Sequence, residues 1–190
     1  MRNPLLILLT LGTPALAQMN HGGMDHGPSS APAQSSMATD MTSLSRLSGK
    51  AFDRAFLSMM IPHHQAAVAM SQAVLGTKDA KVKAWATAII RDQNREIVQM
   101  NALLKAYGGV DTGMQTMMKS MTGDMASSVK NASNKDQAFV QGMTLHHASA
   151  IDMANLALQK SQNLAVLKLA RDITRAQAGE MYEFRTYLLR

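Results

Sequence analysis

Two stretches of the chain follow one pattern: DRAFLSMMIPHHQAAVAM at residues 53–70 and DQAFVQGMTLHHASAIDM at residues 136–153. Both place Asp, Phe, Met, a His-His pair, Ala and Met at matching positions, with a constant offset of 83 (146 − 63). Chance does not align so many residue types at one offset. An internal repeat of this kind predicts two structurally similar halves.

Within each copy the apolar and His positions recur every three or four residues, which is the spacing of one face of an α-helix. No part of the chain alternates polar and apolar residues as a strand does. We expect four long helices, at about residues 49–76, 79–107, 135–160 and 162–189. Two hairpins of this kind form an all-α, ferritin-like four-helix bundle over residues 49–190. Its repeat halves lie at about 51–108 and 135–190, joined by a long crossover at 109–134.

A shorter motif also repeats, with Gln93-x-x-Glu96 in the first half and Gln177-x-x-Glu180 in the second, offset by 84. These polar residues interrupt stripes that are otherwise apolar. A buried carboxylate must be paired or must coordinate an ion. Each Glu is therefore expected to orient a His ring from behind, with its Gln beside it, or to bind a metal directly. The sequence also allows a rotated helix in which Ile90 faces the core and Glu96 faces water.

The N-terminus has the features of a secretory signal peptide at residues 1–17. Arg2 precedes the apolar run 5–11, and Ala15-Leu16-Ala17 offers a cleavage site. The run is too short to span a membrane, and Pro14 argues against a buried helix. The segment 18–48 is rich in Gly, Ser, Pro and Ala, which predicts a flexible tail. We therefore expect a periplasmic or secreted protein, although the exact cleavage position stays open.

Composition excludes several classes of function. The chain has no Cys, so it has neither disulfides nor thiolate metal sites. Its net charge is +6, but the basic residues are spread out and aromatic residues make up 4%, which argues against nucleic-acid binding. Beyond the signal peptide no stretch is long and apolar enough for a membrane span.

The six His residues occupy only three places. Four form the adjacent pairs His63-His64 and His146-His147, and the others lie in the tail. Thioether sulfur is soft and selects Cu(I), while imidazole accepts either oxidation state, so the combination predicts copper, with Cu(I) favoured, Cu(II) allowed and silver as a surrogate. The predicted bundle ligands are the two His pairs with their neighbouring methionines, Met60, Met70, Met143 and Met153. Two alternatives remain: the His and Met are ordinary core residues, or one His of each pair binds and the other is structural.

Two further segments mix the same side chains. The tail carries Met19, His21, Met24 and His26, which predict either a copper-capturing segment or an ordinary leader. The crossover holds five methionines, which predict either an amphipathic helix packed through Met or a further copper-collecting surface. They are Met114, Met117, Met118, Met121 and Met125.

The metalloenzyme sites common in such bundles do not fit. A di-iron carboxylate site needs two Glu-x-x-His motifs, and the chain has none. A hydrolytic zinc site is disfavoured because His-Glu-x-x-His is absent and thioether is a poor zinc ligand. We therefore expect no enzymatic activity.

The blocks MMIPHHQAAVAM (59–70), MTLHHASAIDM (143–153) and DQNREIVQM (92–100) resemble the domain of unknown function 305 family. The resemblance implies a ferritin-like bundle, and some members, the CopM-like ones, are periplasmic copper-binding proteins linked to copper tolerance. The family's Met and His positions carry over to the bundle ligands given above. Thr174 stands where the first half has Ile90, so the two copies are not equivalent.

The expected function is copper sequestration or delivery outside the cytoplasm, with the tail capturing copper and the bundle holding it. The alternative is a non-enzymatic structural or partner-binding bundle whose His and Met side chains form a core face. A redox enzyme that uses the same copper is a third reading. Copper ions are the expected partners, and a second exported copper protein or a homo-oligomer is compatible with the sequence.

Overall fold

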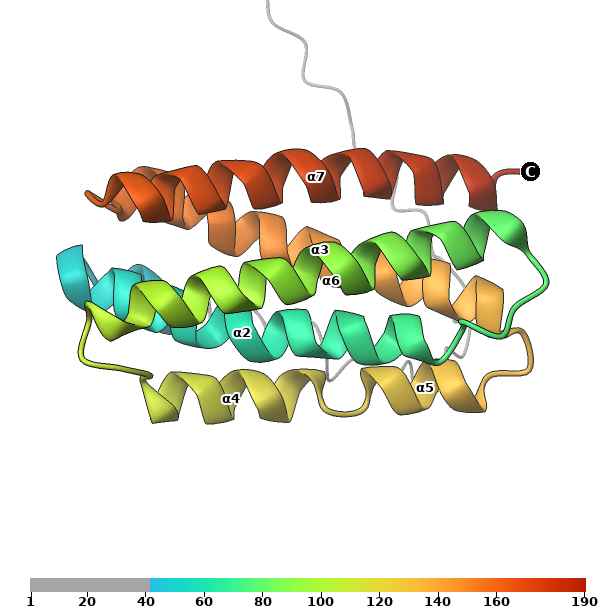
Figure 1. Ribbon diagram of the computed structural model, residues 1–190, viewed down its shortest axis with the longest axis horizontal. Coiled ribbons are helices and arrows are strands. Elements are labelled where there is room, and N and C mark those ends of the chain that lie inside the picture. The colour runs from blue at the N-terminus through green and yellow to red at the C-terminus, as the bar shows by residue number, and fades with distance from the viewer. Residues whose placement is uncertain (1–41) are drawn as a thin grey trace, which may run out of the picture. The chain divides into compact units, whose positions relative to one another are not determined.

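Four long helices form the bundle that the repeat predicts (Figure 1). The computed structural model describes residues 42–190, which all belong to one unit, and this part of the chain contains no strand. The helices are α2 (Gly49–Gln72), α3 (Ala80–Lys105), α6 (Lys135–Lys160) and α7 (Leu164–Leu188). α2 packs closely on α3 and α6 on α7, so each half of the repeat is a hairpin. The predicted all-α bundle is confirmed.

Side-chain caps fix where three of these helices begin. The Asp79 carboxylate accepts from the backbone N–H groups of Lys81 and Val82, and Asn163 caps α7 in the same way. The Asn134 side chain accepts from the Gln137 N–H at the start of α6. Such caps satisfy N–H groups that have no partner within the helix, and each typically contributes about 1 kcal/mol.

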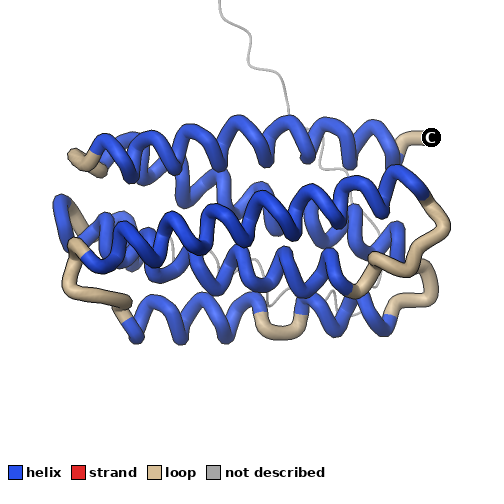
Figure 2. Tube along the Cα trace, in the orientation of Figure 1, coloured by secondary structure: helices blue, strands red, loops and turns tan. Residues whose placement is uncertain are grey.

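The crossover is mostly helical. It forms α4 (Thr112–Thr122) and α5 (Met125–Asn131), which lie along α2 as an additional layer (Figure 2). α5 also contacts α6, so the crossover covers the outer side of the α2–α6 pair. The Asp111 N–H donates to Ser58 Oγ at 2.8 Å, which ties the start of α4 to α2. α2 is consequently buried on almost every side.

The crossover methionines point toward the bundle. Met118 is buried, and Met114, Met117 and Met121 are partly buried against the core below. Met125 packs against a second buried apolar cluster, which includes Trp85, Phe139 and Phe184. The structure therefore has the amphipathic, Met-packed helix of the first alternative, and a copper-collecting role for this face stays a prediction.

Packing begins before the predicted boundary at residue 49. Residues 42–45 are helical, and Leu44 is fully buried in the core. The Lys160 ammonium donates to the carbonyls of Ser45 (2.6 Å) and Leu47 (3.3 Å) and so holds this segment against the end of α6. The predicted tail, 18–48, therefore extends too far, because Leu44 and Leu47 supply an apolar pair within a polar stretch. The predicted signal peptide and the rest of the predicted tail lie outside the described residues.

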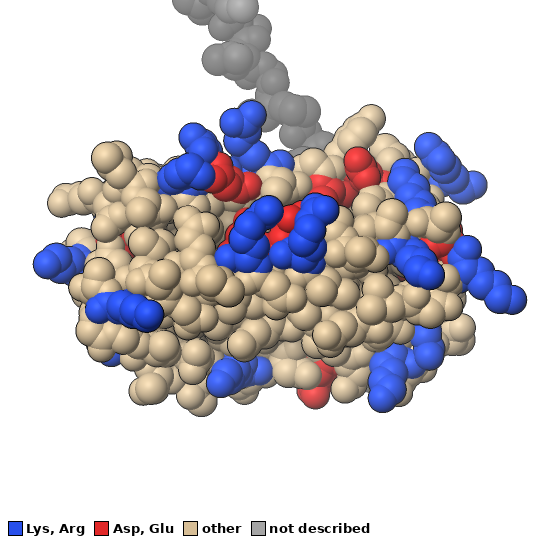
Figure 3. Space-filling view, in the orientation of Figure 1, with Lys and Arg blue, Asp and Glu red and all other residues tan. Residues whose placement is uncertain are grey.

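The surface carries both signs of charge. Lys and Arg side chains are scattered over the face in Figure 3, with a group of basic and acidic side chains near its middle. Within residues 42–190 every helix is too short or too polar to cross a bilayer.

Candidate metal centre

The four bundle histidines form one buried layer inside the bundle. His63 is 1% exposed, and His64, His146 and His147 are fully buried. The rings of His63 and His146 meet across the α2–α6 interface, with centroids 3.7 Å apart. His64 and His147 flank them, with centroids 6.2 and 6.0 Å from their chain neighbours. Adjacent helical residues point about 100° apart, so one ring of each pair faces the opposite hairpin and the other faces its own.

Each outer histidine is paired with a glutamate of its own hairpin. His64 Nε2 lies 2.7 Å from Glu96 Oε2, and His147 Nε2 lies 2.6 Å from Glu180 Oε2. The Glu side chains are only 16% and 26% exposed. An ionised carboxylate only accepts hydrogen bonds, so with both glutamates ionised the ring Nε2–H is the donor in both pairs. α3 is thus not rotated to turn Glu96 toward water.

The inner histidines are held by a different set of acceptors. His146 Nε2 donates to the backbone carbonyl of His63 at 2.9 Å. Ser149 Oγ donates to the carbonyl of His146 and lies 2.6 Å from His63 Nε2. Because its only proton is committed, Ser149 accepts from the His63 ring N–H. Ser149 was not foreseen, because its counterpart in the first half is Ala66 and no repeat marked it.

These contacts leave the same atom free on every ring. The Nδ1 atoms of His63, His64, His146 and His147 are buried and have no hydrogen-bond partner. With the proton on Nε2, each Nδ1 carries an unshared lone pair. A buried polar atom without a partner costs about 1–3 kcal/mol. The four Nδ1 atoms are therefore available to donate their lone pairs to a metal ion.

The environment of His63, His146 and His147 keeps these three rings neutral, which is the form that binds metals. Burial, with the neighbouring imidazoles, holds the pKa values of His63 and His146 well below 6.5. Burial and His64 lower the pKa of His147 to about 3. Burial also raises the pKa of Glu180 to about 7, reinforced by the nearby carboxylates of Asp92, Glu96 and Glu183.

The four predicted bundle methionines are buried and divide into two groups. Met60 and Met153 belong to one apolar cluster, and Met70 and Met143 belong to the other. Each cluster thus receives one predicted Met from each half of the repeat. Met70 lies against Gly142: a Cβ at that position would be 3.7 Å from Met70 Sδ, which is an ordinary van der Waals contact.

Gln93 and Gln177 are also buried, at 4% and 2% exposure. Gln93 Oε1 and both polar side-chain atoms of Gln177 have no partner. Within residues 42–190 no three His, Asp or Glu side chains already converge into a cage for an ion. An ion among the histidines would therefore require sulfur ligands or small side-chain movements. Met19, His21, Met24 and His26 lie outside the described residues.

Several known proteins share this architecture. CopM in its Cu(I)-bound form is 28% identical, with a TM-score of 0.60 over 71% of this chain and 94% of CopM. CopM has also been solved in Cu(II)-bound and Ag-bound forms. A DUF305 protein from Streptomyces coelicolor, described as secreted by inference, is 25% identical with a TM-score of 0.64, covering 72% of this chain and 90% of its own.

Sequence comparison points to the same family. The uncharacterized protein L153 of Acanthamoeba polyphaga mimivirus is 45% identical over 53 residues, which are 27% of this chain and 35% of that relative. The chain thus matches about a third of that relative's length. The model of the domain of unknown function DUF305 matches residues 7–104 and 136–190, which are most of the sequence and both halves of the repeat. The chain belongs to the DUF305 family.

Proposed function

We propose that this protein is an exported, non-enzymatic copper-binding protein that holds the ion by His and Met inside its bundle. The observation that carries the proposal is the set of four buried, unpartnered Nδ1 atoms. Their companion Nε2 atoms all lie within hydrogen-bond distance of fixed acceptors, so the rings are oriented and the buried Nδ1 atoms keep their lone pairs free. An outer acceptor behind a metal-binding His is the usual arrangement in metal sites.

The donor types favour copper over other ions. The layer supplies imidazole groups, and the buried methionines of the two apolar clusters supply thioethers, which select soft Cu(I). CopM, which shares the fold, binds Cu(I), Cu(II) and Ag in its solved forms. Copper is cargo in this proposal: the protein sequesters it or passes it on, and so contributes to copper tolerance.

A structural role for the histidine layer is the second candidate. It is favoured by the complete pairing of the Nε2 atoms and by the absence of a ready-made cage in residues 42–190. In that case the rings serve as a polar core network that fixes the register of α2 against α6. A purely structural role does not explain why the four Nδ1 atoms are buried without a hydrogen-bond partner.

Anaerobic titration of the mature protein with Cu(I), in competition with a chromophoric chelator, separates the two. We expect saturable binding in the wild type and in H21N/H26N, and its loss in H63N/H146N with helicity retained. Binding that survives in H63N/H146N but disappears in H21N/H26N would move the site to the tail. Absence of binding in all three would refute the copper proposal. No consumption of oxygen by the Cu(I)-loaded protein is expected.

A further inference from the structure

An ion must cross protein to reach the histidine layer. All four rings are buried, so none can be reached from solvent without a path. The α2–α3 and α6–α7 interfaces are the closely packed faces within each hairpin. The crossover helices α4 and α5 cover the outer side of α2 and α6. The remaining side of the four-helix bundle is the seam between α3 and α7, which touch each other only sparsely.

The ends of this seam are closed by apolar packing. Trp85 of α3 meets the rings of Phe184 and Tyr187 of α7 edge-on, at centroid distances of 5.0 and 5.5 Å. Toward the other end, Met100 and Leu169 are both buried in one apolar cluster. Only the stretch between these contacts is available for a polar path.

That middle stretch is lined by the repeated polar motif. Gln93 and Glu96 lie one turn apart on α3, and Gln177 and Glu180 lie one turn apart on α7. The two Gln side chains are almost completely buried, yet their amide oxygens have no partner. Buried polar atoms are normally satisfied by protein or by water, so a seam lined by unpaired amides favours hydration over closure.

The two glutamates connect this seam to the histidines. Each has one oxygen within hydrogen-bond distance of a buried outer His and remains partly exposed, at 16% for Glu96 and 26% for Glu180. The outer histidines lie beside the inner pair, His63 and His146. Groups that can coordinate a metal cation therefore follow one another from solvent to the centre of the layer: first a carboxylate, then an outer imidazole, then the inner pair.

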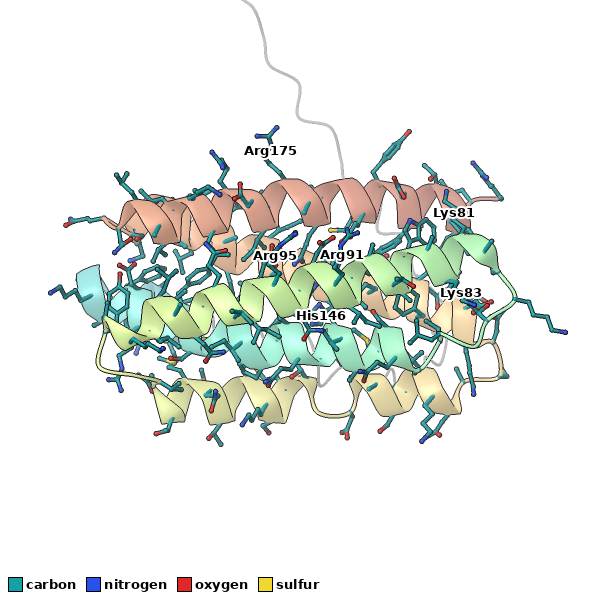
Figure 4. All side chains as sticks on the ribbon, viewed as in Figure 1. Lys81, Lys83, Arg91, Arg95, His146 and Arg175 are labelled. Atoms are coloured by element: carbon teal, nitrogen blue, oxygen red, sulfur yellow. The ribbon has the colours of Figure 1, made fainter. Side chains whose placement is uncertain are left out.

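The charge at the outer rim favours a cation. Asp92, Glu96 and Glu183 all lie close enough to act electrostatically on Glu180. Two guanidinium groups oppose them: Arg91 and Arg95 both bind Asp92, at 2.7 and 2.8 Å, and their side chains are 71% and 73% exposed. Figure 4 shows these two Arg side chains over the region between α3 and α7. Asp92 is neutralised by these two guanidinium groups, whereas Glu96 and Glu180 form no ion pair with Lys or Arg within residues 42–190, so the rim beside the histidines favours a cation.

We propose that the seam between α3 and α7, lined by Gln93, Gln177, Glu96 and Glu180, is the entry route by which a metal cation reaches the buried histidines. The inference rests on the proposed function, because it assumes that these histidines take up copper. The repeated Gln-x-x-Glu motif then has two roles: it orients the His rings, and it sets the rate at which copper enters the bundle.

Quenched flow under anaerobic conditions tests the route. The full mature protein is mixed with Cu(I) held as its acetonitrile complex, and a chromophoric chelator added at set times reports the copper that has not been taken up. The same samples at equilibrium give the stoichiometry. Three double variants are compared with the wild type at low ionic strength: Q93L/Q177L, which makes the seam apolar; E96Q/E180Q, which keeps an acceptor for each His but removes its charge; and R91Q/R95Q.

We expect uptake to slow by about tenfold in E96Q/E180Q, because steering by charge changes association rates by tenfold or more. Q93L/Q177L changes no charge and should also slow uptake, with the stoichiometry unchanged, because an apolar seam removes the polar groups and water that a cation needs on its way in. Uptake should become faster in R91Q/R95Q. The matched control is D124N/D152N, which removes two exposed carboxylates away from the seam and should load at the wild-type rate.

Two results would overturn the route. Wild-type rates in both seam variants, with normal stoichiometry, would show that copper enters elsewhere while the proposed function stands. Equal slowing in D124N/D152N would show that the uptake rate follows the net charge of the protein and not the seam. A wild-type protein that takes up no copper would overturn the proposed function together with the route.

Discussion

Acid should destabilise this fold steeply, because three of the buried histidines stay unprotonated in the native state. His63, His146 and His147 have pKa values below the usual 6.5, that of His147 at about 3. Below pH 6.5 these side chains bind protons in the unfolded chain but not in the native one, so the free energy of unfolding falls as the pH falls. Each such group contributes about 1.4 kcal/mol per pH unit, or about 4 kcal/mol for the three.

Glu180 opposes this trend. Its pKa is raised to about 7, so between pH 7 and its ordinary value of 4.5 the native state binds a proton that the unfolded chain does not. Unfolding in this pH range therefore adds three protons at the histidines and releases one from Glu180, a net uptake of two. Stability should therefore fall by about 2.7 kcal/mol per pH unit between about pH 6 and 5, and more steeply below pH 4.5. A domain with a typical 5–15 kcal/mol of stability would unfold within a few pH units of neutrality.

Urea unfolding of the metal-free protein, followed by helical circular dichroism at half-unit steps from pH 7.5 to 4.5, measures this slope. E180Q is the matched variant: it removes the opposing group, so its slope between pH 6 and 5 should rise to about 4 kcal/mol per pH unit. An unfolding free energy that stays flat between pH 7 and 5 would refute the claim that these histidines are buried and neutral. Identical slopes in wild type and E180Q would refute the role given to Glu180.

Three substitutions test the packing around this layer. L44A should lower the unfolding free energy by about 2–5 kcal/mol if the segment before residue 49 belongs to the core, and a cost below about 0.5 kcal/mol would contradict that placement. S149A removes the acceptor of the His63 ring N–H and should cost about 1–3 kcal/mol in urea unfolding, whereas a neutral change would mean that the contact is dispensable. G142A should raise the melting temperature, because Ala exceeds Gly by about 1 kcal/mol within a helix and the new Cβ only touches Met70; a clear loss of stability would show that the space is needed.

The repeat and the helical spacing predicted the bundle because one signal, the position of apolar and His residues, reports directly on which face is buried. The end of α6 at Lys160 agrees with the prediction, whereas α2 ends at Gln72 rather than at about residue 76. Ala73 to Gly76 form turns, and the buried Val74 continued the apolar pattern beyond the helix itself. Periodicity follows burial and not the backbone, so it cannot locate such an end.

The orientation of the Glu side chains and the use of Ser149 could not be read from the sequence. Both depend on how far each helix is rotated about its axis, and Ile90 and Ile97 offered a competing apolar stripe on α3. The structure resolves this through the His64–Glu96 and His147–Glu180 contacts. Whether these groups serve a metal is a separate question, and the ligand roles of the His and Met residues stay predictions.

The central claim is that the Nδ1 atoms of the buried histidines bind the ion. Long-range ¹H–¹⁵N spectra of the imidazole rings at pH 8, recorded before and after anaerobic addition of Cu(I), test it most directly. The account predicts that all four bundle rings carry their proton on Nε2 in the metal-free protein, and that Cu(I) shifts Nδ1 resonances while Nε2 stays protonated. Rings protonated on Nδ1, or Nδ1 resonances that do not move when copper is bound, would contradict it.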